Sequence, residues 1–113
     1  MRQTALALSL LLFSILPVVS AAPDLQVVGS SMSAGPSHVF ISGEVQNFGS
    51  PAHYGIKVSV VVTDNSGILA TGETSCSMGM LRTGESCWFG FEFSGLRQAI
   101  GSIRYTLTVG SDL

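Results

Sequence analysis

The chain has 113 residues, with five basic side chains, seven acidic ones and a hydrophobic fraction of 46%. This length suffices for one domain with a single modest core. Its weakly acidic balance leaves no basic surface of the kind that displaces counterions from nucleic acids or binds acidic lipid headgroups. We therefore expect neither a nucleic acid nor a membrane surface as the main partner.

The first 22 residues have the pattern of an export signal. A basic residue precedes an apolar run over 5–16, and small residues surround Ala21 and Ala22, as a signal peptidase requires. The alternative is a membrane anchor, but a helix needs about twenty apolar residues to span a bilayer, and this run is shorter. We predict cleavage after Ala21 or Ala22, which leaves a secreted or periplasmic domain of residues 23–113 without stable membrane insertion. The mature chain has a formal charge of −3.

Alternation with a period of two marks the strands of the mature chain, because successive side chains of a strand point to opposite faces. A first edge strand is expected over 24–32, interrupted at Gly29, and a second over 38–46. The second ends at Asn47 and Gly49, since both tolerate the positive φ of a tight turn. A third strand over 56–63 is partly apolar on both faces, which indicates a central position.

Turn signals divide the second half of the chain. The sequence Asp-Asn-Ser-Gly over 64–67 predicts a hairpin into a strand over 68–74, which a stretch over 73–78 continues. After a turn over 81–85, apolar side chains at 87, 89, 91 and 93 alternate with other residues and form the strongest core strand. A longer connection then leads to a last strand over 103–109.

This pattern favours an all-β fold, an antiparallel sandwich of immunoglobulin or fibronectin-III type with about seven strands. The chain combines the sequence Ile-Ser-Gly-Glu-Val-Gln-Asn-Phe-Gly over 41–49 with the 64–67 turn, Leu-Arg-Thr-Gly-Glu over 81–85 and the aromatic strand. Together these motifs resemble FxLYD-type and CARDB-like domains of exported prokaryotic proteins. The resemblance spans Leu25 to Val109, and Val-Val-Val-Thr-Asp stands where the Phe-x-Leu-Tyr-Asp signature would fall. It implies an extracytoplasmic, non-catalytic module.

Two cysteines, Cys76 and Cys87, lie on either side of the 81–85 turn. In an exported protein they are expected to pair, and strands flanking one turn can bring two Cα atoms within reach of a disulfide. A redox or metal role is the alternative, but the spacing is far wider than Cys-x-x-Cys and no second pair is present.

Catalytic groupings are absent from the sequence. The mature chain has no Gly-x-Ser-x-Gly elbow, no His-Glu-x-x-His pair and no phosphate-binding glycine loop, and its acidic residues are scattered singly. His38 and His53 are the only histidines that could serve as a base. We therefore predict a protein that is not an enzyme and that needs no cofactor.

Two places are candidates for binding. The loop from Phe48 to Tyr54 carries two aromatic residues and His53, and loops on a rigid scaffold often carry recognition. The alternative is that Phe48 and Tyr54 fold inward and close the core. Trp88 has the parity of the outer sheet face, where it either stacks against a neighbouring long side chain or forms a patch with Phe40 and Val61. Such an apolar outer face would indicate a partner. The predicted binding site consists of Phe48, His53, Tyr54 and Trp88.

Three functions remain open. The first is an exported structural or interaction module that binds an unidentified protein, a glycan or a second copy of itself. The second is an accessory role in copper handling, because imidazole and thioether groups suit copper; the residues concerned are His38, His53, Met32, Met78 and Met80. The third is a small enzyme whose site only the fold would assemble.

Overall fold

The computed structural model describes residues 18–20 and 24–112, and this part of the chain consists of strands and connecting loops, with no helix. The strands are β1 Val18–Ser20, β2 Leu25–Ala34, β3 His38–Asn47, β4 His53–Tyr54, β5 Lys57–Asp64, β6 Gly67–Ser75, β7 Met80–Leu81, β8 Ser86–Ser94 and β9 Arg104–Gly110. Within these ranges, no helix is long and apolar enough to cross a membrane.

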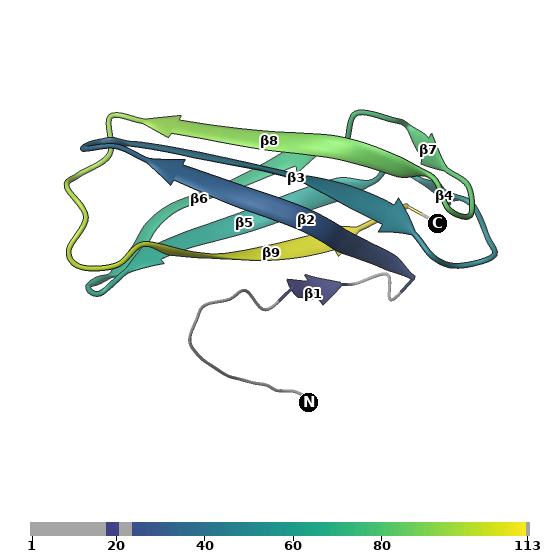
Figure 1. Cartoon of the computed structure of the whole chain (residues 1–113), viewed down its shortest axis with the longest axis horizontal. Helices are drawn as coiled ribbons and strands as arrows, with labels where there is room; N and C mark the ends of the chain where they lie inside the picture. The colour runs from purple at the N-terminus through teal and green to yellow at the C-terminus, as the bar shows by residue number, and fades with distance from the viewer. Residues whose placement is uncertain (1–17, 21–23, 113) are drawn as a thin grey trace.

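Six long strands form two sheets that lie one over the other (Figure 1). One sheet has the order β2-β3-β8 and the other the order β1-β9-β5-β6. All pairs of long strands are antiparallel, and only the three-residue strand β1 runs parallel to its neighbour β9. The antiparallel all-β prediction is thus confirmed. The predicted leader, residues 1–22, lies outside the described residues except for β1.

The long strands agree closely with the expected ones. β2 is an edge strand whose register shifts between Val27 and Gly29, and β5 has a neighbour on each side, as predicted. The 64–67 turn joins β5 to β6 in a hairpin. Two expectations were wrong in detail. β6 is one strand that ends at Ser75 and does not continue to Met78, and the short pair β4 and β7 adds strands that were expected to be loop.

The core lies between the two sheets, and its buried side chains come from both. They are Leu25, Val39, Ile41, Val45, Ile56, Val58, Val60, Val62, Cys76, Leu81, Cys87, Phe89, Phe91, Leu107 and Val109. The alternation predicted for 39–45 and 87–91 is therefore confirmed as burial on one face. Phe93 is only partly buried and packs at the margin of the core.

Gly43 explains why a glycine interrupts the apolar face of β3. It lies opposite Phe89 on β8, and a Cβ at this position would lie 2.6 Å from the Phe89 ring and 2.5 Å from the backbone oxygen of Gly29. The missing side chain leaves room for the aromatic ring to pack over the backbone. The edge-to-face pair of Phe89 and Phe91, with ring centroids 5.9 Å apart, continues this aromatic row along β8.

A buried carboxylate stabilises the end of the molecule where β5 turns into β6. The Asp64 side chain accepts hydrogen bonds from Ser66 in its own turn and from Arg97 at 2.7 and 3.1 Å, and the backbone N–H of Ile100 donates to it at 2.8 Å. These donors, Arg97 first, hold the pKa of Asp64 far below its ordinary value. The long 95–103 connection is thereby tied to the hairpin.

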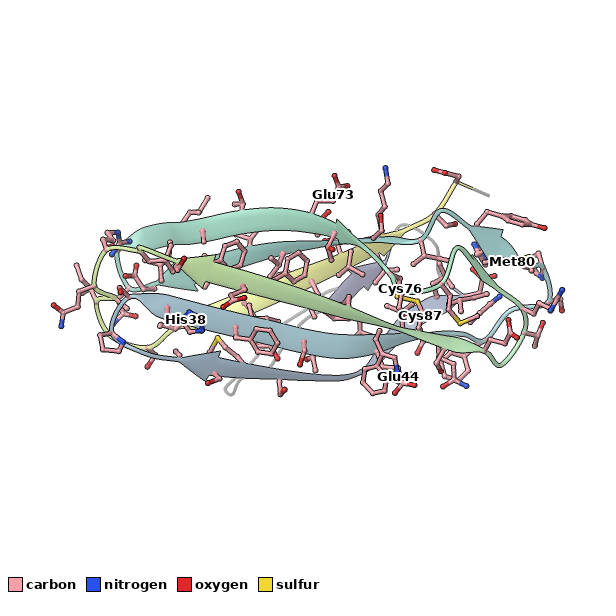
Figure 2. The ribbon with its side chains drawn as sticks, turned by 90° about the horizontal axis from the view of Figure 1, so that it is seen from above. His38, Glu44, Glu73, Cys76, Met80 and Cys87 are labelled. Carbon is pink, nitrogen blue, oxygen red and sulfur yellow. A yellow bond between two sulfur atoms is a disulfide. The ribbon has the colours of Figure 1, made fainter. Side chains whose placement is uncertain are left out.

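The predicted disulfide is present. Cys76 and Cys87 are bonded with their Cα atoms 5.8 Å apart, and neither cysteine is free. Cys76 follows the end of β6 in one sheet, whereas Cys87 lies on β8 in the other, so the bond links the two sheets (Figure 2).

Candidate functional site

The loop after β3 is organised by the side chain of Asn47, which is completely buried. Its amide nitrogen donates to the backbone oxygens of Pro51 and Leu81, both at 2.9 Å, and its amide oxygen accepts from the N–H of Gly49 at 2.8 Å. All three contacts hold backbone groups of the loop or of β7. The Asn-x-Gly sequence that predicted the end of the strand is therefore also the residue pair that folds the loop.

His53 lies inside the molecule, although the sequence placed it on an accessible binding loop. Only 5% of the residue is exposed. Its Nε2 lies 2.8 Å from a carboxylate oxygen of Asp24, and its Nδ1 lies 2.7 Å from the hydroxyl of Ser111. The hydrogen bond to His53 lowers the pKa of Asp24 below its ordinary value of 3.8. The imidazole thus joins the start of β2, the short strand β4 and the segment that follows β9.

Asp24, His53 and Ser111 together have the composition of a hydrolytic triad. A neutral imidazole that donates from Nε2 to Asp24 would accept the proton of the Ser111 hydroxyl at Nδ1. In the serine hydrolases the roles are exchanged: Nδ1 donates to the carboxylate, and Nε2 accepts the proton of the serine hydroxyl. The neighbouring N–H groups of Gly55 and Asp112 donate to backbone oxygens at 3.1 and 2.8 Å, so they are not turned toward an oxyanion. We interpret the three residues as a structural tie.

Sequence reasoning could not find this tie. Asp24 and Ser111 are 29 and 58 positions from His53, and neither residue stands in a motif. Only the fold brings the two ends of the domain to one side of β4.

Phe48 and Tyr54 do not fold inward. Their exposed fractions are 54% and 51%, and the core at this end is filled instead by Ile56 and Leu81. The alternative that these two aromatic residues close the core is therefore wrong. The loop presents two apolar rings to solvent on a backbone that Asn47 fixes.

Trp88 has the largest exposed fraction of any aromatic residue in the described part, 63%. It stands on the outer face of β8, opposite Glu44 of β3. Phe40 lies on the same face, opposite Glu92, and is 41% exposed. Between these two cross-strand pairs lies a row of small residues, in which Ser42 pairs with Gly90. The outer parity predicted for Trp88 and Phe40 agrees with this exposure.

We call this surface the Trp88 face and define it by five outward residues of the β2-β3-β8 sheet: Val28, Phe40, Glu44, Trp88 and Glu92. Val28 is 43% exposed and lies beside the register shift of β2. The surface combines three apolar side chains with two carboxylates.

Val61 does not belong to the Trp88 face. It stands on β5, which lies in the other sheet, and its outward side chain is 37% exposed. The predicted patch of Trp88, Phe40 and Val61 is therefore wrong in one member, because equal parity on strands of opposite sheets places side chains on opposite outer faces.

The residues considered for copper are not gathered in one place. His38 stands at the start of β3 and Met80 on β7, at opposite ends of the molecule in Figure 2. His53 is occupied by Asp24 and Ser111. Over residues 18–20 and 24–112, no group of three or more His, Cys, Asp or Glu side chains is arranged to hold a metal ion.

An open hollow of about 250 Å³ lies beside the tie, over one end of β5 and β9. Its lining includes Lys57 and Glu73 together with Ser111 and Asp112. The hollow is open to solvent, so it lacks the enclosed apolar wall of a small-molecule pocket.

Comparison of the sequence with protein-family models and with curated proteins gives no match.

Proposed function

We propose that this protein is an exported, non-catalytic interaction module with an immunoglobulin-like sandwich fold, related in kind to FxLYD-type and CARDB-like domains. Its partner is a protein, a glycan or a second copy, and the contact surface is the Trp88 face. The observation that carries the proposal is the 63% exposure of Trp88 on the outer face of β8, in a sheet whose outer face also carries the exposed Phe40.

Export is supported by the leader pattern of residues 1–22 and by the disulfide. A bond between Cys76 and Cys87 persists in an oxidising compartment and would be reduced in most cytosols. Secretion or transfer to the periplasm, with cleavage after Ala21 or Ala22, supplies that compartment.

The strand order supports the immunoglobulin-like assignment. The order β2-β3-β8 corresponds to strands A, B and E of that fold, and β9-β5-β6 corresponds to F, C and C′. The six long strands of this chain thus take the positions of A, B, C, C′, E and F, with β6 in the position of C′.

The composition of the Trp88 face is suited to recognition. Tryptophan and phenylalanine offer a large contact area with few rotatable bonds, and an exposed indole stacks on a sugar ring or packs into a protein pocket. Glu44 and Glu92 add hydrogen-bond acceptors at the rim. A partner with hydroxyl or basic groups beside an apolar surface fits this arrangement, whereas a polyanion does not.

The proposal is tested by comparing two variants with matched changes on opposite outer faces. Trp88→Ser removes the aromatic group from the Trp88 face, and Val61→Ser makes a matched change on the opposite outer face. Light scattering of the exported, oxidised protein detects association between copies, cross-linking in the exporting cell detects a protein partner, and titration with cell-envelope glycans detects a sugar. Loss of association in Trp88→Ser alone is the expected result.

The proposal fails if the wild-type protein is monomeric, forms no adduct and binds no glycan. It also fails if Trp88→Ser and Val61→Ser reduce association equally, because the effect would then not belong to the Trp88 face.

A further inference from the structure

The free edge of β9 differs from the other long edges of the two sheets. β9 is the last long strand of its sheet, and among the described residues its side away from β5 is paired only with β1, with Val18 opposite Leu107 and Ser20 opposite Val109 (Figure 1). We call the side of β9 that faces β1 the β9 edge. β1 belongs to the segment that leader cleavage after Ala21 or Ala22 would remove.

From this geometry we propose that the β9 edge of the mature protein is a binding site for an extended, β-branched apolar segment of another polypeptide, which adds in parallel as a further strand. The inference rests on the export and leader cleavage in the proposed function. It concerns a different surface from the Trp88 face, so each can fail without the other.

The chemistry of the occupant follows from the strand that lies there in the full chain. Val18–Ser20 runs parallel to β9, and its first two residues are β-branched and apolar. Such residues favour the extended conformation, and main-chain hydrogen bonds to an open edge supply affinity without a demanding sequence. In the immunoglobulin order this is the position next to strand F, where strand G completes the sheet.

Edge strands usually carry features that prevent pairing with other chains. β6 has Glu73 and Gly72 in its sequence, β2 has the register shift after Val27, and β8 is covered at Trp88 by hydrogen bonds with Ser77. The stretch from Tyr105 to Gly110 has no charge, no proline and no register shift against β5. The β9 edge is therefore shielded from pairing with other chains only when a strand is paired along it.

Over residues 24–112, for which burial is described, the buried apolar side chains and both cysteines form one core between Leu25 and Val109. Ser30 of β2 and Tyr105 of β9 are also joined through their hydroxyl oxygens at 2.8 Å, which links the two sheets beside the β9 edge. Leader cleavage would thus leave this link between the sheets in place and would open one row of backbone donors and acceptors on β9.

The test uses the exported protein, labelled for NMR, and a synthetic peptide with the sequence of residues 17–22 extended by two lysines for solubility. We expect saturable shift changes confined to Arg104–Gly110 and the facing edge of β2, at millimolar peptide because so short a strand binds weakly. A control peptide with both valines replaced by glycine is expected to produce no saturable shift.

Orientation is read with a spin label at either end of the peptide. A parallel strand brings the carboxyl-terminal label near Gly110 and Ser111 and the amino-terminal label near Thr106, following the pairing of β1. The reverse pattern, or shifts that do not saturate, would overturn the proposal.

Two charge variants and one mass measurement complete the design. Thr108→Lys, on β9, is expected to lose peptide binding, whereas Thr71→Lys, on the opposite edge strand β6, is expected to keep it. Trp88→Ser is expected to bind the peptide as the wild type does.

An intact mass showing that the exported chain retains Val18–Ser20 would overturn this inference and leave the proposal for the Trp88 face unaffected.

Discussion

The two regions that the sequence nominated for binding differ in what their side chains contact. In the Phe48 to Tyr54 loop, His53 is buried against Asp24 and Ser111, and the preceding Asn47 fixes the loop through three hydrogen bonds. On the Trp88 face, the indole is exposed and stands opposite a single carboxylate residue. The first region is tied into the fold through Asn47 and His53, although Phe48 and Tyr54 stay exposed, whereas the aromatic side chains of the Trp88 face stand exposed on regular strands.

Residue type alone therefore does not separate a structural loop from a binding surface. Both regions carry aromatic residues, and both were candidates for binding. Substitutions in the loop region should therefore cost stability, and substitutions on the Trp88 face should cost association.

Removing the disulfide is the strongest way to weaken the end of the molecule that holds the loop. A Cys76→Ala, Cys87→Ala double variant opens a link across 11 positions, which should lower the free energy of unfolding by about 2–3 kcal/mol in the chain-entropy model. Denaturant unfolding of the oxidised wild type and the variant measures this. An unchanged midpoint would show that the sheets at this end are held without the bond.

Replacing Asn47 tests the loop itself. Asn47→Ala leaves the backbone oxygens of Pro51 and Leu81 and the N–H of Gly49 without a partner, so the free energy of unfolding should fall by about 2 kcal/mol. Gln46→Ala is the control, because its side chain makes one exposed hydrogen bond at 3.3 Å. Equal losses in both variants would contradict the role given to Asn47.

Acid should weaken the tie at Asp24. Because its pKa is lowered by His53, the folded carboxylate releases its proton more readily than the unfolded one, and the resulting stability is present above pH about 4. It is lost as the pH falls from 3.8 through the lower folded value. Asp24→Asn should be less stable than the wild type at pH 7, with a smaller difference at pH 3. A difference that stays constant across this range would contradict the tie.

Much of the fold was predictable because strands carry their signal locally. The alternation in β3 and β8 gave the buried face, and Asp64 to Gly67 gave the hairpin, since these patterns involve residues close in the chain. The contacts of Asp24 with His53 and of Arg97 with Asp64 join distant segments and left no local pattern. The place of Val61 was missed for a related reason: parity gives the face of a strand, but the assignment of strands to sheets decides which side of the molecule that face occupies.

Trp88 is the single tryptophan of the chain, so a label on this residue type reports on the Trp88 face alone. Protein labelled with 5-fluorotryptophan gives one fluorine resonance, whose position and width report the surroundings of this side chain. When the exported protein associates with its partner, or with another copy at high concentration, we predict that this resonance shifts and broadens, in the wild type and in Val61→Ser alike. A sharp, unmoved resonance under conditions in which the molar mass rises would contradict the account, because association would then occur away from the Trp88 face.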